Sequence, residues 1–270
     1  MSIFEAVILG AVQGITEFLP VSSSGHLVLF QRIFGVTGDN LLFDTLVHGG
    51  TLIAVFIVLW KDIRAILKRI VQPLTAYLIL GTIPAVIVAL LFDETIERAF
   101  STGSFLGFAF LITAALLFGS EMINRYSQKR RGLVQTKKMN WLDALIIGIL
   151  QAIAIIPGVS RSGSTLSGAM FRRLNRDFAA RFSFLLSIPA ILGALVLQTK
   201  DLFKGTGAPE TGISPAALIA GVLTAALVGF FSIRLMLKIV RKRSLLGFAA
   251  YTAILGILIL IDQVFSHIFF

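Results

Sequence analysis

Hydrophobic residues gather in six long runs that alternate with short polar segments. Each run falls within the range of about 17 to 25 residues that an α-helix needs to cross a hydrocarbon core. The runs cover residues 43–60, 74–92, 104–121, 178–197, 214–237 and 245–261. Because helices satisfy their own backbone hydrogen bonds in lipid, this pattern predicts an all-α integral membrane protein with six transmembrane helices.

Two further apolar stretches, residues 3–18 and 141–156, are too short to be ordinary spans. As helices they would rise only about 24 Å, against a core of about 30 Å. Each leads into a loop rich in serine and glycine instead of a charged flank. We therefore expect each stretch to be the first arm of a re-entrant helical hairpin, whose polar loop is satisfied by protein or by a water-filled cavity.

Basic residues show which ends of these helices face the cytoplasm. Four short segments hold 19 of the 24 Lys and Arg residues, and by the positive-inside rule they lie inside. These residues are Lys61, Arg64, Lys68 and Arg69; Arg125, Lys129, Arg130, Arg131, Lys137 and Lys138; Arg172, Arg173, Arg176 and Arg181; and Arg234, Lys238, Arg241, Lys242 and Arg243. The first hairpin must then return to the outside and the second to the cytoplasm, so the two enter from opposite faces.

The two short stretches also resemble each other in sequence. A shift of 138 residues matches seven of sixteen positions, which pair Gly10, Gln13, Ile15, Val21, Ser22, Ser24 and Gly25 with Gly148, Gln151, Ile153, Val159, Ser160, Ser162 and Gly163. Each half has a hairpin and three spans, and an odd number of spans inverts the second copy. We expect one membrane domain over residues 1–270, with inverted-topology repeat halves of about 1–124 and 138–262.

The amino-acid composition excludes several classes of function. The apolar content of 56% exceeds that of soluble domains, and the net charge of +10 comes mainly from short loops, which argues against a nucleic-acid partner. The chain has no cysteine, so disulfides, thiolate catalysis and cysteine-ligated zinc are excluded. The first apolar stretch lacks a basic start and a small-residue cleavage site, so we do not expect a removable signal peptide.

The two polar loops carry groups that suit an anionic ligand. VSSSGH (residues 21–26) and GVSRSGST (residues 158–165) place serines and glycines just ahead of a new helix, whose free amides and dipole attract anions. Placing the charge of Arg161 at membrane depth costs free energy, and its planar guanidinium can bind two phosphate oxygens with parallel hydrogen bonds. Two such loops facing one another would make a phosphate or diphosphate pocket. Pairing of Arg161 with Glu17 is an alternative, and both interpretations can hold together.

The first loop adds groups for catalysis. Gln13 and Glu17 share a helix face, where a carboxylate and an amide oxygen suit a divalent cation such as Mg or Ca, completed by substrate oxygens and water. His26 follows Ser23 by three residues, so its imidazole could take the proton of the hydroxyl. We interpret His48, which has no comparable neighbours in sequence, as structural.

Four segments carry a family resemblance: QGITE (residues 13–17), PVSSSGH (20–26), PGVSRSGST (157–165) and FSFLLSIP (182–189). Together they resemble the undecaprenyl-diphosphate phosphatase family of bacteria, also called bacitracin-resistance proteins, over essentially the whole chain. The resemblance implies a multi-pass enzyme of the bacterial plasma (inner) membrane that acts on a polyprenyl diphosphate lipid. It would hydrolyse the terminal phosphate of undecaprenyl diphosphate to give the monophosphate carrier of cell-wall synthesis, at a site open toward the outer, periplasmic or extracellular side.

The resemblance gives catalytic roles to Glu17, Ser23, His26 and Arg161. Phosphate-binding residues are expected at Ser22, Ser24, Gly25, Ser160, Ser162 and Thr165. The family often has Glu where this chain has Gln13, and one anion fewer should weaken any metal site formed with Glu17.

Three questions stay open at this point. Ser23 could attack the terminal phosphorus with His26 as base, or His26 could itself be the nucleophile. Inverted repeats with broken helices are also typical of secondary transporters, so the chain could instead move an anionic substrate or flip the lipid carrier. The sequence leaves the oligomeric state open, including a homodimer.

Overall fold

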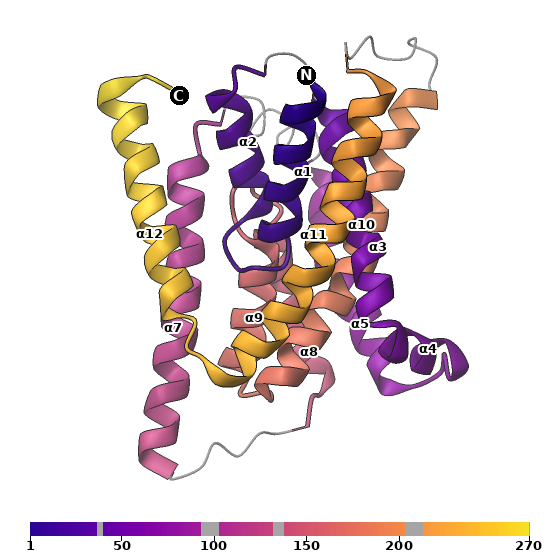
Figure 1. Cartoon of the computed structure of the whole chain (residues 1–270). Coiled ribbons are helices and arrows are strands. Elements are labelled where there is room, and N and C mark those ends of the chain that lie inside the picture. The colour runs from indigo at the N-terminus through magenta and orange to yellow at the C-terminus, as the bar shows by residue number, and fades with distance from the viewer. Residues whose placement is uncertain (37–39, 93–102, 132–137, 204–212, 270) are drawn as a thin grey trace.

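The computed structural model describes residues 1–36, 40–92, 103–131, 138–203 and 213–269 (Figure 1). These residues form helices and connecting loops without any strand, which confirms the all-α class. Within these described ranges, six helices are long and apolar enough to cross a membrane, as predicted. They are α3 (Leu41–Val58), α5 (Pro73–Leu91), α7 (Leu106–Arg131), α10 (Arg176–Phe203), α11 (Pro215–Lys242) and α12 (Leu246–Ile261), the last continued by the π-helical turn η1 (Asp262–Ser266).

The two short apolar stretches form α1 (Ile3–Thr16) and α8 (Trp141–Ile153), each followed by a turn and a second short helix. The second helices are α2 (Ser23–Ile33) and α9 (Arg161–Phe171), and Figure 1 shows the α1–α2 turn near mid-height of the bundle. Capping boxes start both first arms, with Ser2 and Glu5 in α1 and with Asn140 and Asp143 in α8. These caps are again 138 residues apart. Membrane insertion of the hairpins and the inverted repeat stay predictions.

Glycines let each short arm pack tightly on a spanning helix of the other half. A Cβ added to Gly10 of α1 would lie 2.3 Å from the carbonyl oxygen of Gly221 in α11. A Cβ added to Gly148 of α8 would lie 2.6 Å from the carbonyl oxygen of Gly81 in α5. Small residues permit such close helix crossings in membranes, where apolar transfer gives helices no reason to associate. Each short arm is thereby held against a spanning helix of the opposite half.

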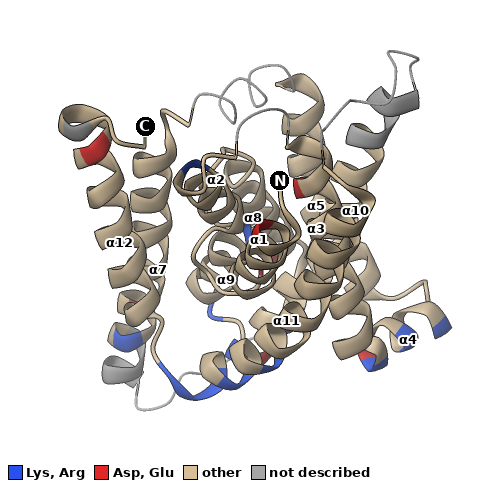
Figure 2. Cartoon of the chain, turned by 45° about the horizontal axis from the view of Figure 1, so that its top comes forward, with Lys and Arg blue, Asp and Glu red and all other residues tan. Residues whose placement is uncertain are grey.

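One end of the molecule is strongly basic, as Figure 2 shows for α4 and the last turns of α11. The short helix α4 (Trp60–Lys68) was not predicted, and it lies to the side of the bundle with Ile63 buried (Figure 1). At this end Arg172 Nε lies 2.6 Å from Oδ1 of the buried Asp143, and Arg176 pairs with the buried Glu121 of α7. The Arg172–Asp143 pair lies within the second half, whereas the Arg176–Glu121 pair joins the two halves.

The tip of the first hairpin is anchored in the apolar core. Phe18, two residues after the end of α1, is fully buried and meets Phe184 of α10 edge to face, with ring centroids 5.5 Å apart. Its neighbour in sequence is Glu17, so the packing of Phe18 fixes where that carboxylate lies.

Candidate active site

Both hairpins end their turns in a serine cap. The side chain of Ser22 accepts a hydrogen bond from the amide of Gly25 at 3.2 Å, and that of Ser160 accepts one from Gly163 at 3.0 Å. Ser22 has a φ of 73°, which L-residues rarely adopt, and Gly158 has a φ of 89°. The turns therefore point the N-termini of α2 and α9, with their unpaired amides, toward the same interior region.

The two tips touch through three contacts. Arg161 of α9 forms an ion pair with Glu17 at the end of α1. The hydroxyl of Ser162 donates to the carbonyl of Leu19 at 3.0 Å, and the amide of Gly158 donates to Ser24 Oγ at 3.3 Å. The expected meeting of the two loops is thus present in the structure, and so is the alternative pairing of Arg161 with Glu17.

Glu17 is the centre of this contact. Its side chain is 6% exposed, and Oε1 accepts from the Arg161 guanidinium. Its Oε2 accepts from Ser23 Oγ at 2.6 Å and from Gln13 Nε2 at 3.1 Å. The carboxylate is therefore in position to receive the hydroxyl proton of Ser23.

His26 is buried, but it does not contact Ser23 as the sequence suggested. Its Nδ1 lies 2.7 Å from the Ser22 carbonyl, which can only accept, so Nδ1 carries a proton. Its Nε2 lies 2.7 Å from the hydroxyl of Tyr251 on α12, and the two rings stack with centroids 5.7 Å apart. A neutral His26 therefore presents a bare Nε2 that accepts from Tyr251, while Ser23 is paired with Glu17. The base next to Ser23 in this structure is Glu17.

His48 belongs to the site, contrary to its interpretation as structural. It lies on α3, and its Nε2 is 3.6 Å from Glu17 Oε2, while Nδ1 donates to the Asp44 carbonyl at 2.6 Å. A protonated His48 would therefore be a second cation beside Glu17. The signal that could have found it is an ionisable residue inside a transmembrane run.

Hydroxyl groups of α9 and α10 hold Arg161 in place. Thr165 Oγ1 donates to the Arg161 carbonyl at 2.9 Å and lies 2.6 Å from Ser183 Oγ. The guanidinium itself donates to the Ser183 carbonyl at 3.3 Å. Ser160 and Ser162 lie with their hydroxyl oxygens 3.2 Å apart at the start of α9. Ser183 was not among the predicted site residues, although it lies in the FSFLLSIP segment.

The donor set suits a divalent cation only in part. Gln13 Oε1 is buried without a hydrogen-bond partner beside Glu17, which leaves one hard oxygen free to bind a ligand. Within the described segments, His, Cys, Asp and Glu form no cluster of three that could hold a metal ion. Gln13 therefore offers one free oxygen, whereas both oxygens of Glu17 already accept hydrogen bonds, and a seat for Mg or Ca formed by these two residues stays a prediction.

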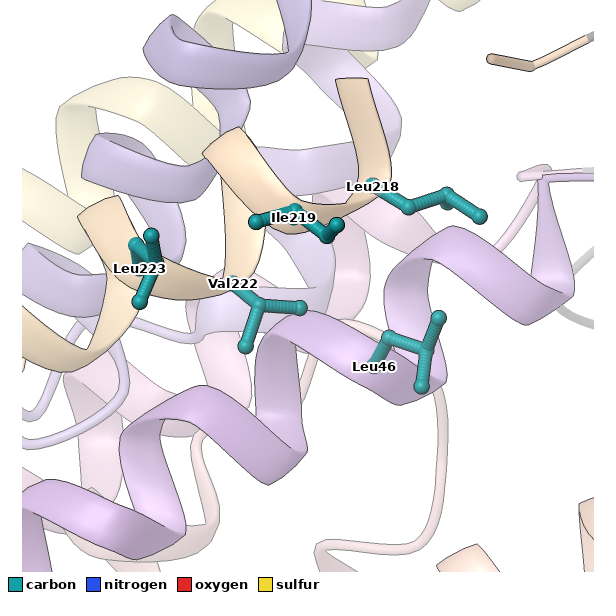
Figure 3. Close-up of a pocket in the computed structure, with 5 residues that line it drawn as sticks. All are labelled: Leu46, Leu218, Ile219, Val222 and Leu223. Carbon is teal, nitrogen blue, oxygen red and sulfur yellow. The ribbon is translucent and has the colours of Figure 1, made fainter. Parts of the chain in front are cut away.

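Two surface depressions differ in their relation to these residues. One, with a volume of about 240 Å³, lies between α3 and α11 and is lined by aliphatic side chains, which Figure 3 draws. The other, of about 500 Å³, lies between the first hairpin and α12 and contains His26 and Tyr251. Only this second depression includes an expected catalytic residue.

Comparisons with known sequences show the family to which this chain belongs. A protein named undecaprenyl-diphosphatase from Carboxydothermus hydrogenoformans is 47% identical over 263 residues, covering 97% of this chain and 98% of the relative. One of the same name from Halothermothrix orenii is 43% identical over 263 residues, with the same coverages. Undecaprenyl-diphosphatase 4 of Bacillus thuringiensis (strain Al Hakam) is 42% identical over 269 residues and the full length of both chains. The sequence profile of the bacitracin resistance protein BacA family matches residues 6–258, and the chain therefore belongs to this family.

Proposed function

We propose that this chain is a membrane phosphatase that hydrolyses undecaprenyl diphosphate to undecaprenyl phosphate and inorganic phosphate, and so recycles the lipid carrier of cell-wall synthesis. The observation that carries the proposal is Glu17, which contacts both the Ser23 hydroxyl and the Arg161 guanidinium from the opposite hairpin. A nucleophile, a base and an anion-binding cation are thus brought together. Transport of an anion needs donors but no base beside a hydroxyl, so this arrangement favours hydrolysis.

The first step is attack by Ser23 Oγ on the terminal phosphorus. Glu17 Oε2 takes the hydroxyl proton, the Oγ–P bond forms, and the bond from that phosphorus to the bridging oxygen breaks. The bridging oxygen leaves with undecaprenyl phosphate. Arg161 and the amides at the N-termini of α2 and α9 bind the charged phosphate oxygens during this transfer.

The second step is hydrolysis of the phosphoserine. Water attacks from the side that the leaving group has vacated, and His26 accepts its proton on Nε2 in place of the hydrogen bond from Tyr251, then releases that proton to solvent. Glu17 returns its proton to Ser23 Oγ as the Oγ–P bond breaks, which releases inorganic phosphate. Support for separate roles comes from Glu17 binding Ser23 while His26 binds Tyr251.

A divalent cation, when bound, would neutralise charge on the diphosphate oxygens. Gln13 Oε1 and Glu17 are the residues that would hold it. The serines expected to bind phosphate also have structural roles. Ser22 and Ser160 cap their helices, while Ser24 and Ser162 connect the two tips.

We further propose that the site opens toward the outer side of the bacterial plasma membrane. The basic residues at the end that holds α4 support this orientation, since such residues stay in the cytoplasm. The inverted repeat is supported by the matching caps of α1 and α8 and by the matching glycine crossings at Gly10 and Gly148. A homodimer stays a prediction.

Phosphate release by the purified protein tests the function. In detergent with Mg, the wild type should release inorganic phosphate from undecaprenyl diphosphate, and Glu17→Gln should lose nearly all of this activity. Arg172→Lys, altered in an ion pair at the basic end, is the matched control and should keep it. A wild-type protein that binds the lipid and releases no phosphate would contradict the proposal and favour transport.

A further inference from the structure

The groove between the first hairpin and α12 is mostly apolar and contains one pair of polar side chains that bond to each other. Its volume is about 500 Å³, and Ile15, Leu19, Phe30 and Phe248 supply much of its wall. Such a volume is enough for a drug-sized ligand. Two hydroxyls in the lining are already engaged, because Thr16 donates to a carbonyl of its own helix at 2.6 Å and Ser244 accepts from Arg125 at 3.2 Å.

The remaining polar groups of the lining are His26 and Tyr251, which bond to each other at 2.7 Å. His26 lines the groove and follows Ser23 by three residues in α2, so the groove begins within one helical turn of the proposed nucleophile. A ligand with a charged head at Ser23 and a hydrocarbon chain would pass His26 and enter the groove. The depression in Figure 3 contains no residue of that centre.

We propose that this groove holds the part of the prenyl chain next to the diphosphate, with the His26–Tyr251 pair beside the phosphate that stays on the lipid. The inference rests on the proposed phosphatase function and adds where the chain lies. A phospholipid acyl chain could also fill an apolar groove. Only the prenyl chain is tethered to a head group bound at Ser23, which raises its effective concentration there.

The groove should contribute more to the orientation of the bound lipid substrate than to its binding affinity. The prenyl chain is already dissolved in lipid, so moving it into the groove gains little from the hydrophobic effect. A chain held in one direction does, however, fix the terminal phosphorus in line with Ser23 Oγ. Blocking the groove should therefore affect turnover of the lipid and leave binding of a chain-free head group intact.

Gly247 offers a direct test because it lines the groove and a Cβ added there meets no atom within 4 Å, so the backbone has room for a side chain at this wall. We expect Gly247→Phe to lower kcat/KM for undecaprenyl diphosphate about tenfold, a typical effect of altered fit in an apolar pocket. Inhibition by inorganic diphosphate, which has no chain, should stay within twofold of wild type. Gly193→Phe is the matched control, because Gly193 of α10 also has open space around it and lies outside the groove.

Photo-crosslinking of the wild type locates the chain without any substitution. A prenyl diphosphate with a diazirine on its second isoprene unit should label the peptide that contains Phe248, and a phospholipid with a diazirine in its acyl chain should not compete at equal concentration. Labelling at Leu223 in the other depression, or full competition by the phospholipid, would overturn the groove assignment. So would unchanged kcat/KM in Gly247→Phe. Absence of phosphate release by the wild type would instead contradict the phosphatase function itself.

Discussion

Replacing Arg161 by Lys tests whether a guanidinium fork, and not merely a positive charge, is needed between the two hairpin tips. In the structure one nitrogen of Arg161 binds Glu17 and another donates to the Ser183 carbonyl at 3.3 Å, which leaves other N–H groups for phosphate. A lysine ammonium cannot hold these partners and bind phosphate with two parallel hydrogen bonds. Loss of one charge-assisted hydrogen bond corresponds to about 2 to 3 kcal/mol. That energy predicts a fall in kcat of about 30- to 150-fold.

The assay is phosphate release from undecaprenyl diphosphate in detergent, with kcat and KM measured separately. Lysine is preferable to alanine because it keeps a cation beside the buried Glu17, whereas removing one partner of a buried pair costs about 3 to 5 kcal/mol of stability. Arg172→Lys should keep kcat within twofold of wild type, since its partner Asp143 lies outside the site. A kcat for Arg161→Lys within twofold of wild type would refute the proposed phosphate contact.

Three further changes test neighbouring parts of the account. Tyr251→Phe removes the hydroxyl that holds His26 Nε2 and keeps the stacked ring, so kcat should fall about threefold to tenfold; an unchanged kcat would remove Tyr251 from the mechanism. Gln13→Glu adds an anion beside Glu17 and should lower the Mg concentration for half-maximal activity about tenfold, measured by titration after chelation; an unchanged requirement would place the cation elsewhere. Gly148→Ala should destabilise the fold by about 1 to 3 kcal/mol through overpacking, seen as a lower unfolding temperature than that of Gly193→Ala; equal temperatures would contradict the close crossing.

The spans and the hairpin tips could be predicted because their signals are local. Hydropathy and length fixed the six long helices, and the shortness of α1 and α8 set them apart from ordinary spans. The serines and glycines before α2 and α9 marked two helix N-termini, and the charge of Arg161 beside an apolar helix called for an anionic partner. Glu17 proved to be that partner in the structure.

The interactions that could not be predicted depend on long-range packing. Tyr251 lies 225 residues from His26 in sequence, and only the placement of α12 brings the two together. His48 reaches Glu17 because of the way α3 is rotated against α1, which hydropathy alone does not specify. The helical spacing of Ser23 and His26 suggested a direct pair, but the carbonyl of Ser22 and the hydroxyl of Tyr251 occupy both ring nitrogens.

The central claim is that Ser23, activated where the two hairpin tips meet, forms a covalent bond to the terminal phosphate. The most direct measurement uses purified enzyme, undecaprenyl diphosphate with a radioactive terminal phosphate, a rapid acid quench and peptide mapping. We expect an acid-stable phosphoserine at Ser23. An acid-labile label on His26, or turnover without any labelled protein at the shortest quench times, would contradict it.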